Sequence, residues 1–201
     1  RFGLAQTLFP GLPKGSGKGK VRLSVVLRKT LENTDQRVRD GQPVTPAFLF
    51  AALLWRPVDD ETHRVMQSGM PHSVAIQKAA TRVLSRQSAS ISIPKRFTTV
   101  MRDIWGMQSR FHYRGGKRAI GVLEHKKFRA AYDFLCIRAQ VGEVADNTDL
   151  EADCQWWTDI QKQGVDEQKK LLLNAPNKKS SRRRRRRPSA SRSGRRAGTG
   201  P

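Results

Sequence analysis

The segment 46–55 constrains the fold of this chain more than any other part of its sequence. It reads PAFLFAALLW, and Thr45 followed by Pro46 forms a typical helix start, an N-cap residue with proline at the first helical position. A helix that is apolar on every side belongs at the centre of a protein core. We therefore expect a central helix here, ended by Pro57, with the other elements packed around it.

Helical spacing extends over most of the remaining chain, where apolar residues recur at intervals of three and four. The pair Gly115-Gly116 interrupts this pattern, and Thr148 with Glu151 has the form of a capping box. No segment alternates convincingly between apolar and polar residues, so the predicted fold class is all-α, an irregular helical bundle. The further predicted helices cover residues 21–38, 58–68, 72–87, 94–111, 120–139 and 148–164.

The charge of the chain is strongly positive and unevenly distributed. Its 39 Lys and Arg residues against 17 Asp and Glu residues give a net charge of +22. Residues 177–201 carry +11, residues 62–132 carry +12, and residues 141–168 carry −7. The longest apolar run, 47–55, is far shorter than the about 20 residues that a membrane helix needs. We therefore expect a polyanionic partner, either nucleic acid or an anionic membrane surface.

The strongest local signal is the arginine-rich tail, residues 169–201. Its six consecutive arginines stand among Ser, Gly and Pro, a composition that cannot bury a core and predicts disorder. Guanidinium groups bind phosphate bidentately, so we expect contact with RNA or DNA. A targeting signal, contact with an acidic protein and simple solvation stay open as alternatives. The tail residues predicted to bind RNA are Arg182, Arg183, Arg184, Arg185, Arg186 and Arg187.

A second basic region surrounds the predicted helix 94–111 and the glycine pair after it. In one interpretation this face contacts phosphates, and Trp105, Phe111 and Tyr113 act as stacking platforms for bases. In the other, the aromatic residues are core and the cations form a solvated face; the composition favours neither. The candidate RNA-binding residues of this region are Lys95, Arg96, Arg102, Arg110, Arg114, Lys117, Arg118, Lys126 and Lys127.

No part of the sequence has the pattern of a catalytic or metal-binding site. Segment 15–20 (GSGKGK) lacks the spacing of a phosphate-binding P-loop. The consecutive acids 59–61 point in different directions near a predicted helix start, so we do not expect them to hold a metal. Cys136 and Cys154 cannot form a disulfide framework, and we interpret Cys136 as a small hydrophobic residue in a reducing cytoplasm. We therefore predict no catalytic residue, metal ligand or cofactor within the chain.

Five stretches of the sequence are specific enough to be compared with a known protein family. They are NTDQRV at 33–38, PVTPAFLFAALLW at 43–55, IPKRFTTVMRDIW at 93–105, GKRA at 116–119 and LEHKKFRAAYDFL at 123–135. Together they closely resemble the C-terminal half of bacterial poly(A) polymerases, and Trp156-Trp157 and the arginine-rich end fit the same family.

The resemblance implies a template-independent nucleotidyltransferase that adds AMP from ATP to RNA 3′ ends, a polyadenylation that promotes RNA decay in bacteria. The catalytic head of the family carries Gly-Ser followed by Asp-x-Asp, which hold Mg²⁺. This pattern does not occur here, so no catalytic residue can be assigned. We expect a fragment that lacks this head and is inactive alone.

The resemblance also implies an organisation and a set of partners. We expect an N-terminally incomplete helical body at 1–90, a helical leg at 91–168, and the tail at 169–201. RNA, contacted through its backbone near 3′ ends, is the expected partner in the cytoplasm, with RNA-decay proteins as further partners of the tail and no membrane. The alternatives are a stand-alone nucleic-acid-binding module and a scaffold for acidic proteins, both without enzymatic activity.

Overall fold

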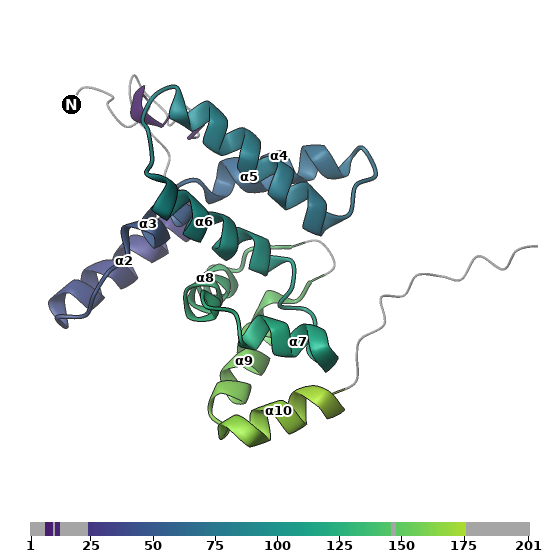
Figure 1. The fold of residues 1–201 in the computed structure, drawn as a ribbon. Helices are drawn as coiled ribbons and strands as arrows, with labels where there is room; N and C mark the ends of the chain where they lie inside the picture. The colour runs from purple at the N-terminus through teal and green to yellow at the C-terminus, as the bar shows by residue number, and fades with distance from the viewer. Residues whose placement is uncertain (1–6, 10, 13–23, 146–147, 176–201) are drawn as a thin grey trace, which may run out of the picture.

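The structure, a computed structural model, describes residues 7–9, 11–12, 24–145 and 148–175 (Figure 1). Within these residues the chain forms helices and no strand, apart from an isolated bridge between Ala145 and Thr148, which confirms the predicted all-α class. No helix of the described part is long and apolar enough to cross a membrane. The helices are α2 (Val25–Arg39), α3 (Pro46–Leu53), α4 (Trp55–Met66), α5 (His72–Ser88), α6 (Lys95–Gln108), α7 (Gly116–Leu123), α8 (Phe128–Gln140), α9 (Leu150–Gln161) and α10 (Val165–Asn174).

Helix α3 contributes to the first of two hydrophobic cores, but it is not buried on every side as its apolar sequence predicts, since Phe48, Phe50 and Leu53 are only half-buried. Its residues Ala47, Ala51 and Ala52 are fully buried. The small side chains let α6 approach closely, and the indole Nε1 of Trp105 donates to the Ala51 carbonyl oxygen at 3.1 Å. Phe48 is half-buried at the border of this core, where its ring meets the edge of Phe134 on α8.

The second core lies among α7, α8, α9 and α10. Trp157 and Phe111 are fully buried there, and Trp157 Nε1 donates to the Phe111 carbonyl oxygen at 2.9 Å. Helix α8 contributes side chains to both cores, because Phe134 packs in the first and the adjacent Leu135 in the second. Figure 1 accordingly shows α8 between the group α3–α6 and the group α7, α9 and α10.

Pro57 does not end a helix, contrary to the sequence prediction. Helix α3 ends at Leu53, and α4 begins at Trp55, so Pro57 falls within the first turn of α4. The backbone N–H groups of a first turn have no partner inside the helix, so proline, which lacks one, is tolerated there. The predicted start of this helix at residue 58 was therefore three residues late.

Two features of the C-terminal helices also differ from the prediction. The N-cap of α9 is Asp149, whose carboxylate accepts from the Ala152 N–H at 3.0 Å; the predicted cap, Thr148, lies one residue earlier. Helix α10 was not predicted, and it crosses the boundary that we placed before residue 169. It buries Leu172 in the second core. Residues 176–201 of the tail lie outside the described residues.

A disulfide joins Cys136 of α8 to Cys154 of α9, with 5.2 Å between the Cα atoms. Cys136 does pack against the second core, as expected of a small hydrophobic residue, but its sulfur is bonded to Cys154, which the sequence analysis did not expect. Two cysteines 18 residues apart have no diagnostic spacing, and only the packing of α8 against α9 brings them together.

Candidate nucleic-acid interface

Cations occupy the starts of three consecutive helices. Lys95 and Arg96 begin α6, Lys117 and Arg118 lie in the first turn of α7, and Lys127 is the N-cap residue of α8. None of these helices has an acidic residue in its first turn. The N-terminal end of a helix carries a partial positive charge, so cations at this end lower helix stability.

Helices α9 and α10 show the opposite arrangement. Glu151 and Asp153 lie in the first turn of α9, and Asp166 and Glu167 lie in that of α10. These acids follow the usual electrostatic preference of a helix N-terminus. The cations at the starts of α6, α7 and α8 oppose it, so an external anion explains them better than helix stability does.

Most of the predicted candidates face solvent. Arg102 also contacts α5, because its Nη1 donates to Thr81 Oγ1 at 2.8 Å. Lys127 is half-buried. The exposed candidates are Lys95, Arg96, Arg102, Arg110, Lys117, Arg118 and Lys126.

Arg114 has a different environment from the other candidates. Its guanidinium forms an ion pair with Asp153, with Nη2 at 2.6 Å from Oδ1 and Nε donating to the same oxygen at 2.7 Å. Asp153 is buried, so this pair holds the start of α9 against the segment that precedes α7. We therefore assign Arg114 a structural contact and leave it out of the interface.

The structure shows which of Trp105, Phe111 and Tyr113 belong to the core and which could stack on bases, a choice that the sequence analysis left open. Trp105 and Phe111 are fully buried and belong to the two cores, so they cannot act as stacking platforms for bases. Tyr113 is half-buried, and the guanidinium of Arg118 lies 4.9 Å from its ring centre. The core interpretation is thus correct for Trp105 and Phe111.

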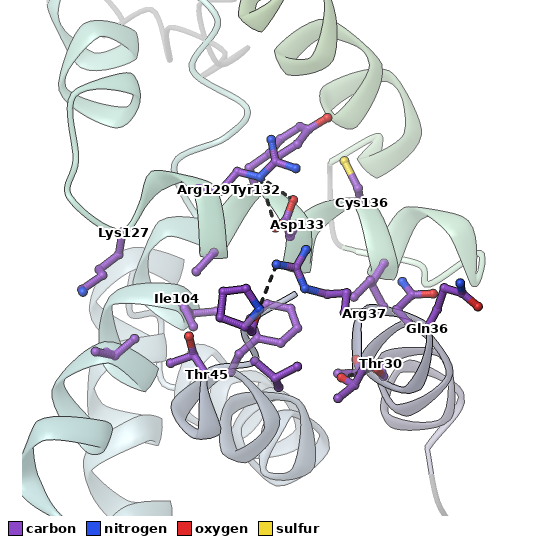
Figure 2. A pocket seen from close by; sticks show the side chains of 18 of the residues that line it. Thr30, Gln36, Arg37, Thr45, Ile104, Lys127, Arg129, Tyr132, Asp133 and Cys136 are labelled. Carbon is purple, nitrogen blue, oxygen red and sulfur yellow. Dashed lines mark hydrogen bonds and ion pairs between the residues drawn. The ribbon is translucent and has the colours of Figure 1, made fainter. Parts of the chain in front are cut away.

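A cavity of about 720 Å³ lies between α2, α3, α6 and α8 (Figure 2). Four cations line it, Lys126, Lys127, Arg129 and, from α2, Arg37; Asp133 is the one acid among its lining residues. Its size falls in the range of about 300–1,000 Å³ that is usual for ligand sites. Its lining charge favours an anionic ligand.

Two of these cavity cations were missed in the sequence. Arg37 Nη2 donates to the Pro43 carbonyl oxygen at 3.3 Å, and Arg129 Nε lies 3.1 Å from Asp133 Oδ1. Burial raises the pKa of Asp133, and Arg129 opposes this rise. Arg37 and Arg129 are 92 positions apart, and local spacing carries no signal that places α2 beside α8.

The end of α10 lies against the start of α7. Gly115 directly precedes α7, and a Cβ atom at this position would overlap the carbonyl oxygen of Ala175. Ala175 is the last residue that the structure describes, so the described chain ends beside the start of α7, where Lys117 and Arg118 lie. The predicted RNA-binding arginines at 182–187 lie outside the described residues.

The acidic residues of the described ranges do not form a metal centre. No group of three or more His, Cys, Asp or Glu side chains gathers there. Asp60 pairs with Arg56 at 2.9 Å and Glu61 with Arg82 at 2.9 Å, so these neighbouring acids turn to different partners.

Comparison with known proteins identifies the family. Residues 68–191 match the family described as the arginine-rich C-terminus of polymerase A. A poly(A) polymerase I of Salmonella typhi is 41% identical over 200 residues, and one of Escherichia coli O157:H7 is 40% identical over 200 residues. Each match covers 98% of this chain and 42% of the relative. A poly(A) polymerase I of Haemophilus influenzae is 31% identical over 174 residues, 86% of this chain and 38% of its own length.

The chain thus spans about two fifths of the length of the curated relatives that it matches. The family match covers more than half of the chain and includes α5 to α10. On this basis the chain belongs to the family of the arginine-rich C-terminus of polymerase A.

Proposed function

We propose that this chain is the RNA-binding part of a poly(A) polymerase, an enzyme that adds AMP from ATP to RNA 3′ ends. The observation that carries the proposal is the placement of cations at the starts of α6, α7 and α8, against helix preference. The cation-lined cavity and the names of the relatives support it. A polymerase without a template must bind any sequence, and phosphate contacts carry no sequence information.

The chemistry of AMP transfer belongs, in this proposal, to a part of the enzyme that these residues do not include. ATP and Mg²⁺ are proposed for the whole enzyme, and the described residues gather no acids fit to hold the metal. The helices of this chain would bind the RNA backbone and so raise the local concentration of RNA 3′ ends near the catalytic head. The proposed setting is polyadenylation that promotes RNA decay in the bacterial cytoplasm, with decay proteins as partners of the tail.

A salt titration of RNA affinity tests this proposal. Each phosphate contact contributes about 0.7 to the slope of log affinity against log salt for single strands. A variant with Lys95, Arg96, Lys117 and Arg118 changed to Gln should lower the slope by up to about 2.8, equally for oligo(A) and for a mixed-sequence RNA.

The matched control removes four cations that already pair with an acid. These are Arg56, Lys162, Lys169 and Lys170, whose ion pairs measure 2.9, 2.8, 3.5 and 4.0 Å. The control should leave the slope nearly unchanged. If the two variants change the slope equally, RNA binding depends only on the net charge of the chain and the proposed interface is wrong. If the chain binds polyglutamate more tightly than RNA, an acidic protein is the better candidate for the partner.

A further inference from the structure

Three arginines converge on one covered carboxylate between α4 and α5. Glu61 of α4 has a side chain only 4% exposed. Arg82 Nη1 lies 2.9 Å from its Oε1, and Arg86 Nη2 lies 3.4 Å from its Oε2. Arg64, one turn along α4, places Nη1 3.3 Å from Oε2. None of these four residues was predicted as part of a binding site.

The charges in this cluster do not balance. One carboxylate faces three guanidinium groups, which leaves two positive charges, and the arginine side chains are 55–68% exposed. Helix α5 contains no acidic residue that could compensate them. Asp60 of α4 is engaged elsewhere, since it pairs with Arg56.

The carboxylate organises the cluster. Arg82 and Arg86 lie four residues apart on α5, a spacing at which like charges repel. The hydrogen bond from Arg82 lowers the pKa of Glu61, so the carboxylate is ionised at neutral pH and holds both arginines in place. Each guanidinium has five N–H donors in a planar fork, and those not used on Glu61 suit the oxygens of a phosphate group.

The cluster continues into the cations of α6. Thr81, the residue before Arg82, accepts the hydrogen bond from Arg102 of α6. An extended polyanion could therefore contact α5 and α6 without leaving the basic surface. This continuity favours a repeating phosphate backbone over a single small anion.

We propose that Arg64, Arg82 and Arg86, held by Glu61, form an additional binding site for RNA backbone phosphates. The site lies on α4 and α5, apart from the starts of α6, α7 and α8. It rests on the proposed RNA-binding function and extends the RNA path across a second pair of helices.

The test measures the salt dependence of single-stranded RNA binding by the full chain with Arg82→Gln and Arg86→Gln. Loss of two phosphate contacts should lower the slope by about 1.4. The control carries Arg56→Gln and Lys162→Gln, which also removes two positive charges. The side-chain exposures match closely, 55% and 63% in the test pair against 55% and 64% in the control. The control slope should stay unchanged.

A second variant tests the same site in case the first variant does not fold. Arg64→Gln removes the most exposed of the three arginines and leaves Arg82 and Arg86 on Glu61. It should lower the slope by about 0.7, with an unchanged melting curve. Slopes equal to that of the wild type in both variants would overturn the site.

The outcomes also separate this site from the proposed function. If the variant at the starts of α6 and α7 loses slope and the Arg82/Arg86 variant does not, the site is refuted and the function stands. If the unaltered chain binds no RNA, both are refuted. If the Arg82/Arg86 variant loses affinity for polyglutamate with its RNA slope unchanged, the cluster is a protein contact and the proposed RNA site is wrong.

Discussion

The buried Arg138 and the half-buried Glu143 form an ion pair, 2.9 Å from Nη2 to Oε1, at the place where the two cores meet. The guanidinium of Arg138 also donates to Gln108 Oε1 at 3.1 Å and lies 4.3 Å from the ring centre of Trp55. The indole Nε1 of Trp55 donates to Glu143 at 3.1 Å. The pair thus connects α4, α6 and α8 with the segment that follows α8.

Removal of Glu143 should therefore destabilise the whole domain. Glu143→Ala removes the carboxylate that the buried guanidinium of Arg138 hydrogen-bonds, and the free energy of unfolding should fall by about 3–5 kcal/mol. Urea denaturation measures this change. Glu151→Ala, at an exposed acid of α9, is the control and should change stability much less. A loss below about 1 kcal/mol for Glu143→Ala would show that Arg138 does not depend on this partner.

Two glycines around α7 should respond oppositely to alanine. A Cβ atom at Gly115 overlaps the Ala175 carbonyl oxygen, so Gly115→Ala must displace the end of α10 and should cost about 1–3 kcal/mol. Gly121 lies inside α7 with nothing within 4 Å of its added Cβ, so Gly121→Ala should stabilise by about 0.5–1 kcal/mol. Thermal denaturation of both variants compares them. A stabilising Gly115→Ala would contradict the close approach of α10.

Local sequence signals predicted elements far better than they predicted contacts. Apolar spacing placed α5 and α6 nearly correctly, because Pro94 and the apolar faces are features of neighbouring residues. The same approach failed at Pro57, since proline is compatible with both a helix end and a first turn. Contacts between residues distant in sequence carry no such signal. Glu61 and Arg82 are 21 residues apart, and Arg114 and Asp153 are 39 apart, so no periodicity could pair them.

Two carboxylates of α4, Asp59 and Glu61, should give opposite dependences on pH. Burial raises the pKa of Asp59 above 3.8, and Glu143 adds to the rise, while His63, Arg138 and Arg56 oppose it. The folded state therefore binds this proton more tightly, and stability is lost as the pH rises through the raised pKa. Asp59→Asn removes this loss and should increase the free energy of unfolding near neutral pH.

Glu61 has the opposite sign, because the hydrogen bond from Arg82 lowers its pKa below 4.5. Its contribution is present above pH 4.5 and is lost as the pH falls through the lowered pKa. Glu61→Gln should therefore destabilise near neutral pH and flatten the loss of stability in acid. Urea titrations across this range compare both variants with the wild type. Equal signs for Asp59→Asn and Glu61→Gln would refute the assignment.

The disulfide between Cys136 and Cys154 should contribute to stability in an oxidising buffer. It closes a loop with a sequence separation of 18, and loops of this length are expected to contribute about 3 kcal/mol. Addition of a reductant should lower the free energy of unfolding by this amount in the wild type. The double variant Cys136→Ser, Cys154→Ser should not respond to the reductant. An equal response of both proteins would show that the two thiols are not joined in solution.

The tail and the helices should contribute separately to RNA binding. Deletion of residues 177–201 removes eleven basic residues and leaves α10 intact, because α10 ends at Asn174. If about six of these cations engage phosphates at once, the slope of log affinity against log salt should fall by about 4. Weaker binding should persist through the cations at the starts of α6 and α7.

A length-matched control separates charge from chain length in this experiment. Replacement of the six arginines at 182–187 by Gln keeps the tail and should produce most of the same loss of slope, without a change in melting temperature. Because phosphates carry no sequence information, the loss should be alike for oligo(A) and mixed-sequence RNA. An unchanged slope in both variants would mean that the tail arginines do not contact RNA phosphates and bind another partner. In that case the helix cations would have to account for all of the RNA affinity.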